Sequence, residues 1–142
     1  MFVQISGDVV QPGVYGFCKP PDLKALLVRA GGLISERETA RTPTGVLCNS
    51  GADIIVRHRG KGVQVFQGEM SAFQMITFGM PVSLNRETRE GLTAIPGIGP
   101  GLAKAIVRER TGRGGFQALD EILSVPGIGP ALYRKISPYL AL

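Results

Sequence analysis

Two short segments in the last third of the chain combine proline, glycine and isoleucine in the same order. Residues 95–106 read IPGIGPGLAKAI, and residues 125–136 read VPGIGPALYRKI. They agree at the Pro-Gly-Ile-Gly-Pro core, at the leucine two places further on and at the final isoleucine. A repeat of this length indicates two copies of one structural unit.

The chemistry available in each copy is that of the main chain. Glycine lacks a Cβ atom, and we expect both glycines of the first turn, Gly97 and Gly99, to reach positive φ. Pro100 suits the first turn of a helix, where an N–H group would have no intrahelical partner. The amides of Gly97, Ile98 and Gly99 therefore precede a positive helix end, against which a phosphate oxygen can lie. Such a site contacts the backbone of a nucleic acid and reads no bases.

Basic side chains on the following turns add positive charge. The basic face is expected to carry Lys104, Arg108, Arg110, Arg113, Arg134 and Lys135. The predicted DNA-binding residues are Gly97, Ile98, Gly99, Gly101, Lys104, Arg108, Gly127, Ile128, Gly129, Arg134 and Lys135. The first hairpin is the stronger candidate for a phosphate contact. The alternative is that both hairpins only pack two helices together or dock a protein.

Apolar residues at helical spacing must position these turns. Around the first turn the spacing predicts helices over residues 87–95 and 102–110, with Ile98 pointing back into the core. The predicted core is Leu92, Ile95, Ile98, Leu102, Ile106, Phe116, Leu119, Ile122, Leu123, Ile128, Leu132 and Ile136.

As a pair, the two copies resemble the helix-hairpin-helix (HhH) motif in its two-copy form. The surrounding sequence also resembles the DNA-binding domain of ComEA-like competence proteins. The residues that carry this resemblance are 83–92 (SLNRETREGL), Gly115-Phe116 and 138–140 (PYL). The resemblance implies sequence-independent binding of double-stranded DNA at the phosphate backbone and minor-groove edge. In that family the residue after the second proline is often basic or hydroxyl-bearing. Here it is Gly101 or Ala131, so the side-chain contact must come from Lys104, Arg134 or Lys135.

The first eighty residues follow a different pattern, of short strands around one helix. The expected strands are residues 2–5, 14–17, 46–47, 54–56 and 63–66, and the expected helices are residues 23–30 and 70–78. Residues 5–15 (ISGDVVQPGVY), 23–32 (LKALLVRAGG) and 51–56 (GADIIV) resemble the SLBB domain, which has a β-grasp fold. The order SLBB then paired HhH is itself the ComEA arrangement.

The predicted fold class is therefore α+β. Residues 1–80 form an SLBB, β-grasp-like domain, and residues 83–142 form a small all-α paired HhH domain, joined near residues 79–82. A self-association role is expected of the first domain, through a sheet edge beside residues 2–5 that offers unpaired main-chain groups. No constellation for a small ligand or cofactor is evident in it.

Composition bounds the class of protein. The chain has 142 residues, of which 44% are hydrophobic and 19% are charged, and this composition is typical of a globular protein. The formal net charge of +5 supports nucleic-acid binding only weakly.

Cys18 and Cys48 are expected to be free or buried, with a disulfide as the alternative. No membrane-spanning run or signal peptide is evident. The ComEA resemblance implies a soluble fragment of an exported or anchored protein at the periplasmic or extracellular face of the membrane, working with the DNA-uptake machinery of the inner membrane.

Enzymatic and metal sites lack the residues they need. His58, Cys18 and Cys48 show no metal-ligand spacing, and the eleven acidic residues form no paired motif. We therefore expect a non-enzymatic DNA receptor for natural transformation, without cofactor or metal. The alternatives are a protein- or ligand-interaction scaffold with structural hairpins, and a cytoplasmic DNA-repair accessory subunit.

Overall fold

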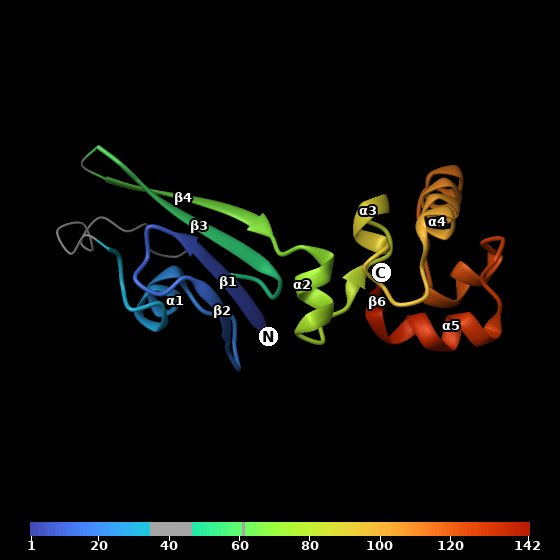
Figure 1. Cartoon of the computed structure of the whole chain (residues 1–142), viewed down its shortest axis with the longest axis horizontal. Coiled ribbons are helices and arrows are strands. Elements are labelled where there is room, and N and C mark those ends of the chain that lie inside the picture. Colours follow the sequence, from blue (N-terminus) through green and yellow to red (C-terminus); the bar gives the residue numbers. More distant parts are fainter. Residues whose placement is uncertain (35–46, 61) are drawn as a thin grey trace. The chain divides into compact units, whose positions relative to one another are not determined.

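The computed structural model describes residues 1–34, 47–60 and 62–142. The chain divides into two units, Met1–Met70 and Ser71–Leu142, each with its own hydrophobic core. The first unit contains a sheet and the second consists mainly of short helices (Figure 1). The predicted mixture of a β-containing part followed by a helical part is confirmed at this level.

A mixed four-stranded sheet organises the described residues of the first unit. Its strands lie in the order β2-β1-β3-β4. The strands are β1 (Phe2–Gly7), β2 (Gly13–Gly16), β3 (Ala52–Arg59) and β4 (Gly62–Glu69). β1 is antiparallel to β2 and parallel to β3, and β3 is antiparallel to β4.

Helix α1 (Leu23–Arg29) packs on this sheet (Figure 1). It begins where the Asp22 carboxylate accepts a hydrogen bond from the Ala25 N–H at 2.7 Å, a typical N-cap. Leu23, Leu26 and Leu27 are buried against alternating strand residues, since period-2 side chains share one face of a sheet. The buried strand residues of this core include Val3, Ile5, Ala52, Ile54 and Val56.

The sheet edges differ from the prediction. Residues 2–5 were expected beside a free edge, but β1 lies between β2 and β3 and pairs with both. The edges are β2 and β4. The reason is the parallel β1–β3 pairing, which joins segments far apart in sequence and leaves no signal in the local pattern. Of the predicted strand at residues 46–47, Val46 lies outside the described residues, and Leu47 forms an isolated bridge with Asp22.

The second unit contains the two repeat copies. Its elements are α2 (Ala72–Thr77), β5 (Val82–Ser83), α3 (Arg89–Leu92), α4 (Pro100–Arg113), η2 (Leu119–Ser124), α5 (Pro130–Ile136), η3 (Ser137–Tyr139) and β6 (Leu140–Ala141). β5 and β6 form a short parallel pair that joins the segment between α2 and α3 to the C-terminal end of this unit. The prediction of an all-α domain is therefore wrong, because this unit contains a short β-pair.

Most of the predicted core of this unit is buried. Leu92, Ile95, Ile98, Ile106, Phe116, Ile122, Ile128 and Ile136 are buried, while Leu102, Leu119 and Leu132 are partly buried against them. Leu123 was predicted in the core but is 40% exposed. It lies in a 3-10 helix rather than an α-helix, and the tighter winding carries it off the buried face.

Helix α2 falls in the second unit. Ala72 is buried in its core, and Met75 and Ile76 pack against that core. The boundary between units lies between Met70 and Ser71, whereas the sequence pattern placed the joint at residues 79–82 and expected this helix to pack back on the first domain. A six-residue amphipathic helix carries no signal for which core it joins. Among the described residues, no helix combines the length and apolar character needed to cross a bilayer.

Candidate nucleic-acid interface

Each repeat copy forms a tight turn that ends at a helix. In the first copy the one-turn helix α3 leads through Pro96 and Gly97 to Gly99, the N-cap of α4. The predicted helix over residues 87–95 is thus shortened to Arg89–Leu92, while the second predicted helix extends to Pro100–Arg113. Pro100 takes the first helical position, as predicted.

The two glycines of each turn have different conformations. Gly97 and Gly127 have φ of 109° and 96°, which an L side chain rarely adopts. Gly99 and Gly129 have φ of −85° and −95° with ψ of 174°, an extended conformation open to any residue. The prediction that both glycines reach positive φ is therefore wrong for the second one. A residue at a helix N-cap is extended rather than left-handed, which explains the difference.

Ile98 and Ile128 anchor the turns and do not offer their amides. Both side chains are buried, as predicted for Ile98. The Ile98 N–H donates to the Ile95 carbonyl at 3.0 Å, and the Ile128 N–H donates to the Val125 carbonyl at 3.0 Å. The prediction that these two amides contact phosphate is therefore wrong, because both N–H groups already have a partner in the protein. Closing the turn requires this hydrogen bond.

The flanking glycine amides are available. Gly97 and Gly99 are exposed, and within the described residues neither N–H donates a hydrogen bond to the protein. Gly127 and Gly129 have the same status. At Gly99 and Gly129 a Cβ atom would point into open space, because no described residue other than the chain neighbours has an atom within 4 Å. Each turn thus presents two bare amides at the start of a helix, with unobstructed access.

The two turns pack reciprocally. A Cβ atom on Gly97 would lie 3.0 Å from Leu132 Cδ1, and one on Gly127 would lie 2.9 Å from Leu102 Cδ1. Leu102 and Leu132 are the leucines conserved between the two copies of the repeat. Each turn therefore rests on the helix of the other copy. The sequence predicts both leucines in the core but does not predict that each one contacts the turn of the other copy. Their identical position in the two repeat copies is the signal that could have indicated this contact.

Four predicted cations remain open to solvent. Lys104, Arg108, Arg134 and Lys135 are exposed, and none of their side chains makes a hydrogen bond or ion pair with another described residue. Gly101, in the first turn of α4, is exposed as well. None of these side chains is tied to an internal partner, so all of them can approach a polyanion.

Two other predicted cations are used inside the unit. Arg110 Nη1 donates to the carbonyls of Leu84 and Glu87 at 2.9 and 2.8 Å. Arg113 donates to the Ser124 hydroxyl at 3.1 Å and stacks over the Phe116 ring. Both therefore hold segments of the fold together, and the predicted basic face shrinks by two residues.

An open depression of about 500 Å³ adjoins the start of α4. Its lining residues are Arg89, Glu90, Thr93, Pro100, Gly101 and Lys104. The one acidic group, Glu90, pairs with Arg89 at 2.9 Å. Hydrogen bonds from its own backbone and from Arg89 lower the pKa of the Glu90 carboxyl. Sequence reasoning assigned no role to Arg89, whose guanidinium offsets this negative charge beside the first hairpin.

Metal and thiol chemistry have no assembled site in the described part of the chain. No group of three or more His, Cys, Asp or Glu side chains is placed there to hold a metal ion. Cys18 is exposed and Cys48 is buried, and neither forms a disulfide with another described residue. Burial raises the pKa of the Cys48 thiol, which keeps it protonated.

Two comparisons show which known proteins the chain is similar to. A family model described as "Helix-hairpin-helix motif" matches residues 79–141. Over 135 residues, 94% of this chain, the sequence is 30% identical to ComE operon protein 1 of Bacillus subtilis (strain 168). The chain spans 66% of the length of that relative, slightly less than two thirds. The chain is therefore ComEA-like in sequence over most of its length, and its C-terminal part matches the helix-hairpin-helix motif.

Proposed function

We propose that the second unit binds double-stranded DNA without reading its sequence, through phosphate oxygens at the minor-groove edge. The observation that carries this proposal is the pair of exposed, unbonded amides of Gly97 and Gly99 at the start of the 14-residue helix α4. Backbone N–H groups at a helix start favour anions and carry no base specificity. The exposed cations Lys104, Arg108 and Lys135 supply the charge that attracts a polyanion.

The setting we propose is DNA uptake in natural transformation. A non-enzymatic receptor at the outer face of the inner membrane would hold incoming DNA for the uptake machinery. The similarity to ComE operon protein 1 supports this role. In the same proposal the first unit is an SLBB, β-grasp-like domain that self-associates, so that several weak HhH contacts act on one DNA molecule. The edge strands of the described sheet, β2 and β4, replace the edge that the sequence pattern suggested.

A titration with two duplexes of unrelated sequence tests DNA binding. We expect equal affinities and a linear fall of log K with log salt concentration. If each of the four exposed cations of the candidate site neutralises one phosphate, the slope is about −3.6, since each neutralised phosphate contributes about −0.9. The charge-matched control is Lys24→Ala, at an exposed residue of α1 in the first unit, which should leave both affinity and slope unchanged. A strong preference for one sequence, or no binding at low salt, would refute the proposal.

The structural alternative has one observation in its favour, the reciprocal packing of each turn on the other copy's helix. A purely structural pair of hairpins predicts that removing exposed cations leaves DNA binding unchanged. Lys104→Ala decides between the two roles. The receptor proposal expects lower affinity for both duplexes and a salt slope that is smaller by about one ion.

A further inference from the structure

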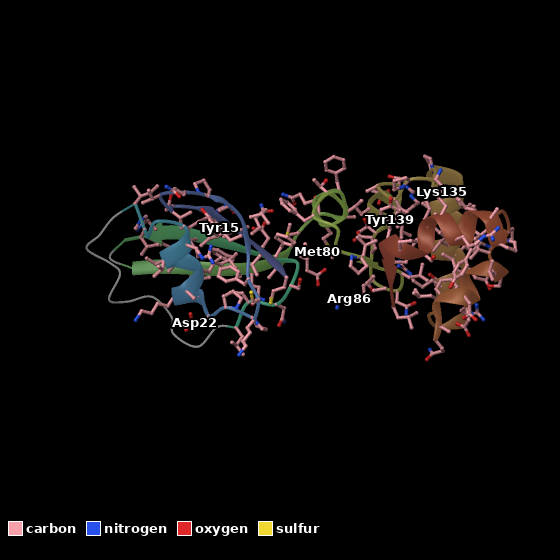
Figure 2. All side chains as sticks on the ribbon, turned by 90° about the horizontal axis from the view of Figure 1, so that it is seen from below. Tyr15, Asp22, Met80, Arg86, Lys135 and Tyr139 are labelled. Carbon is pink, nitrogen blue, oxygen red and sulfur yellow. The ribbon has the colours of Figure 1, made fainter. Side chains whose placement is uncertain are left out.

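Lys135 belongs in sequence to the second repeat copy, but its side chain lies against the first hairpin. A Cβ atom on Gly97 would be 3.7 Å from Lys135 Cδ, 3.6 Å from Ile136 Cγ2 and 3.0 Å from Leu132 Cδ1. All three residues belong to α5, so one face of this helix runs along the first turn. Lys135 is labelled in Figure 2, where its place within the second unit can be followed.

The second hairpin has no such neighbour. The repeat places Gly127 in register with Gly97, Leu132 with Leu102, and Lys135 with Ala105. Correspondingly, among the described residues and apart from its chain neighbours, Leu102 is the one residue that a Cβ atom on Gly127 would meet within 4 Å. Where the first hairpin has Lys135 of the opposite copy beside it, the position that corresponds to Lys135 in the first copy is occupied by Ala105. The two hairpins are therefore alike in backbone and unequal in charge.

The Lys135 ammonium is free to act at the first hairpin. The residue is exposed, and within the described part of the chain its ammonium has no carboxylate or carbonyl partner. Its aliphatic stem rests beside Gly97, an arrangement in which lysine keeps its charged end in water. A phosphate oxygen held by the Gly97 and Gly99 amides would lie about 2.9 Å from their nitrogen atoms. Beyond Cδ, the Lys135 side chain continues through Cε to the ammonium nitrogen Nζ, which starts from this position beside Gly97.

We propose that Lys135 is a phosphate-contacting residue of the first hairpin, supplied by the second repeat copy, and that the first hairpin is consequently the dominant DNA contact. This inference rests on the proposed DNA binding and refines it. The neighbouring residue Arg134 matches Lys104 in the repeat, so each copy already has that cation. Within the two aligned repeat segments, residues 95–106 and 125–136, Lys135 is the cation that has no basic counterpart in the other copy.

A double-mutant cycle in the full chain tests the assignment. Lys135→Met keeps the stem beside Gly97 and removes the charge. Gly99→Val and Gly129→Val each place a side chain in open space over one hairpin's amides, in an extended conformation that valine accepts. In the parent, Lys135→Met should weaken duplex binding about fivefold to tenfold at low salt and lower the salt slope by about one ion. Lys24→Met is the charge-matched control, with no expected effect.

The coupling identifies the hairpin that Lys135 serves. We expect Lys135→Met to have little further effect once Gly99→Val has closed the first hairpin, and its full effect in the Gly129→Val background. In addition, Ala105→Lys should raise affinity in the parent by giving the second hairpin the missing cation. Coupling to Gly129 instead of Gly99, or equal effects in both backgrounds, would overturn the inference. Failure of the parent to bind DNA would refute the proposed function itself.

Discussion

At the scale of single residues, the two glycines of each turn divide two tasks. Gly97 is required by the fold, because its φ is 109° and a side chain there would press on Leu132. Gly99 is extended and faces open space, so its lack of a side chain has no conformational purpose. What a side chain at Gly99 would obstruct is access to the amides. The conformational position and the access position are thus separate residues.

Substitution at these two positions should separate stability from binding. Gly99→Val should lower DNA affinity about tenfold or more, while the free energy of unfolding falls by less than about 1 kcal/mol, the order of an N-cap change. Gly97→Ala should instead destabilise the unit by about 1–3 kcal/mol, because the left-handed backbone becomes strained. Denaturant unfolding and duplex titration of both variants measure the two effects. Equal loss of stability in both would contradict this division.

At the scale of the elements, polar side chains hold the segments around the first hairpin in place. Asn85 Nδ2 donates to the Phe116 carbonyl and its Oδ1 accepts from the Phe116 N–H, both at 2.8 Å. Arg110, on α4, binds the carbonyls of Leu84 and Glu87 just before α3. These contacts join α3, α4 and the link to the second copy. A helix of one turn such as α3 depends on such tertiary support, since isolated short helices are unstable.

The two hydrogen bonds between the Asn85 side chain and the Phe116 main chain should contribute strongly to the free energy of unfolding, although Asn85 is partly exposed. Asn85→Ala leaves both main-chain groups of the buried Phe116 without a partner, at a cost of about 1–3 kcal/mol for each group. We expect the second unit to lose about 2–4 kcal/mol of unfolding free energy. Gln117→Ala, an exposed neighbour whose side chain makes no hydrogen bond within the described residues, should change it by less than about 0.5 kcal/mol. A denaturant series on both variants measures the difference.

At the scale of the whole molecule, the second unit begins before its family signature. The matched family covers residues 79–141, but the unit begins at Ser71 and includes α2. Ser71 starts α2 with a capping box in which its hydroxyl accepts from the Gln74 N–H. Ala72 and Val82 are buried in the same core as the two repeat copies. The helix is thus part of the core that supports the candidate interface.

Two fragments of the second unit test this boundary. Residues 71–142 retain α2 and the β5–β6 pair, whereas residues 83–142 lose α2 together with Val82. Burying one valine side chain contributes about 1.5–3 kcal/mol, so the shorter fragment should be at least about 2 kcal/mol less stable. Thermal unfolding monitored by circular dichroism compares them. Equal stability would place the boundary at residues 79–82 after all.

The sequence by itself determined the features that depend on local chemistry. The repeat, its prolines and glycines, and the helical spacing around them predicted two turns, the start of α4 and the burial of Ile98, because turn residues and periodicity act over a few positions. The same local rules predicted a helix over residues 23–30, which the structure has as α1 (Leu23–Arg29).

Only the tertiary structure decided which segments meet. The placement of β1 between β2 and β3, the membership of α2 in the second unit and the use of Arg110 as an internal clamp all arise from contacts distant in sequence. The position of Lys135 beside Gly97 is of the same kind. Local sequence sets the conformation of a turn, whereas packing against another segment determines which side chains surround it.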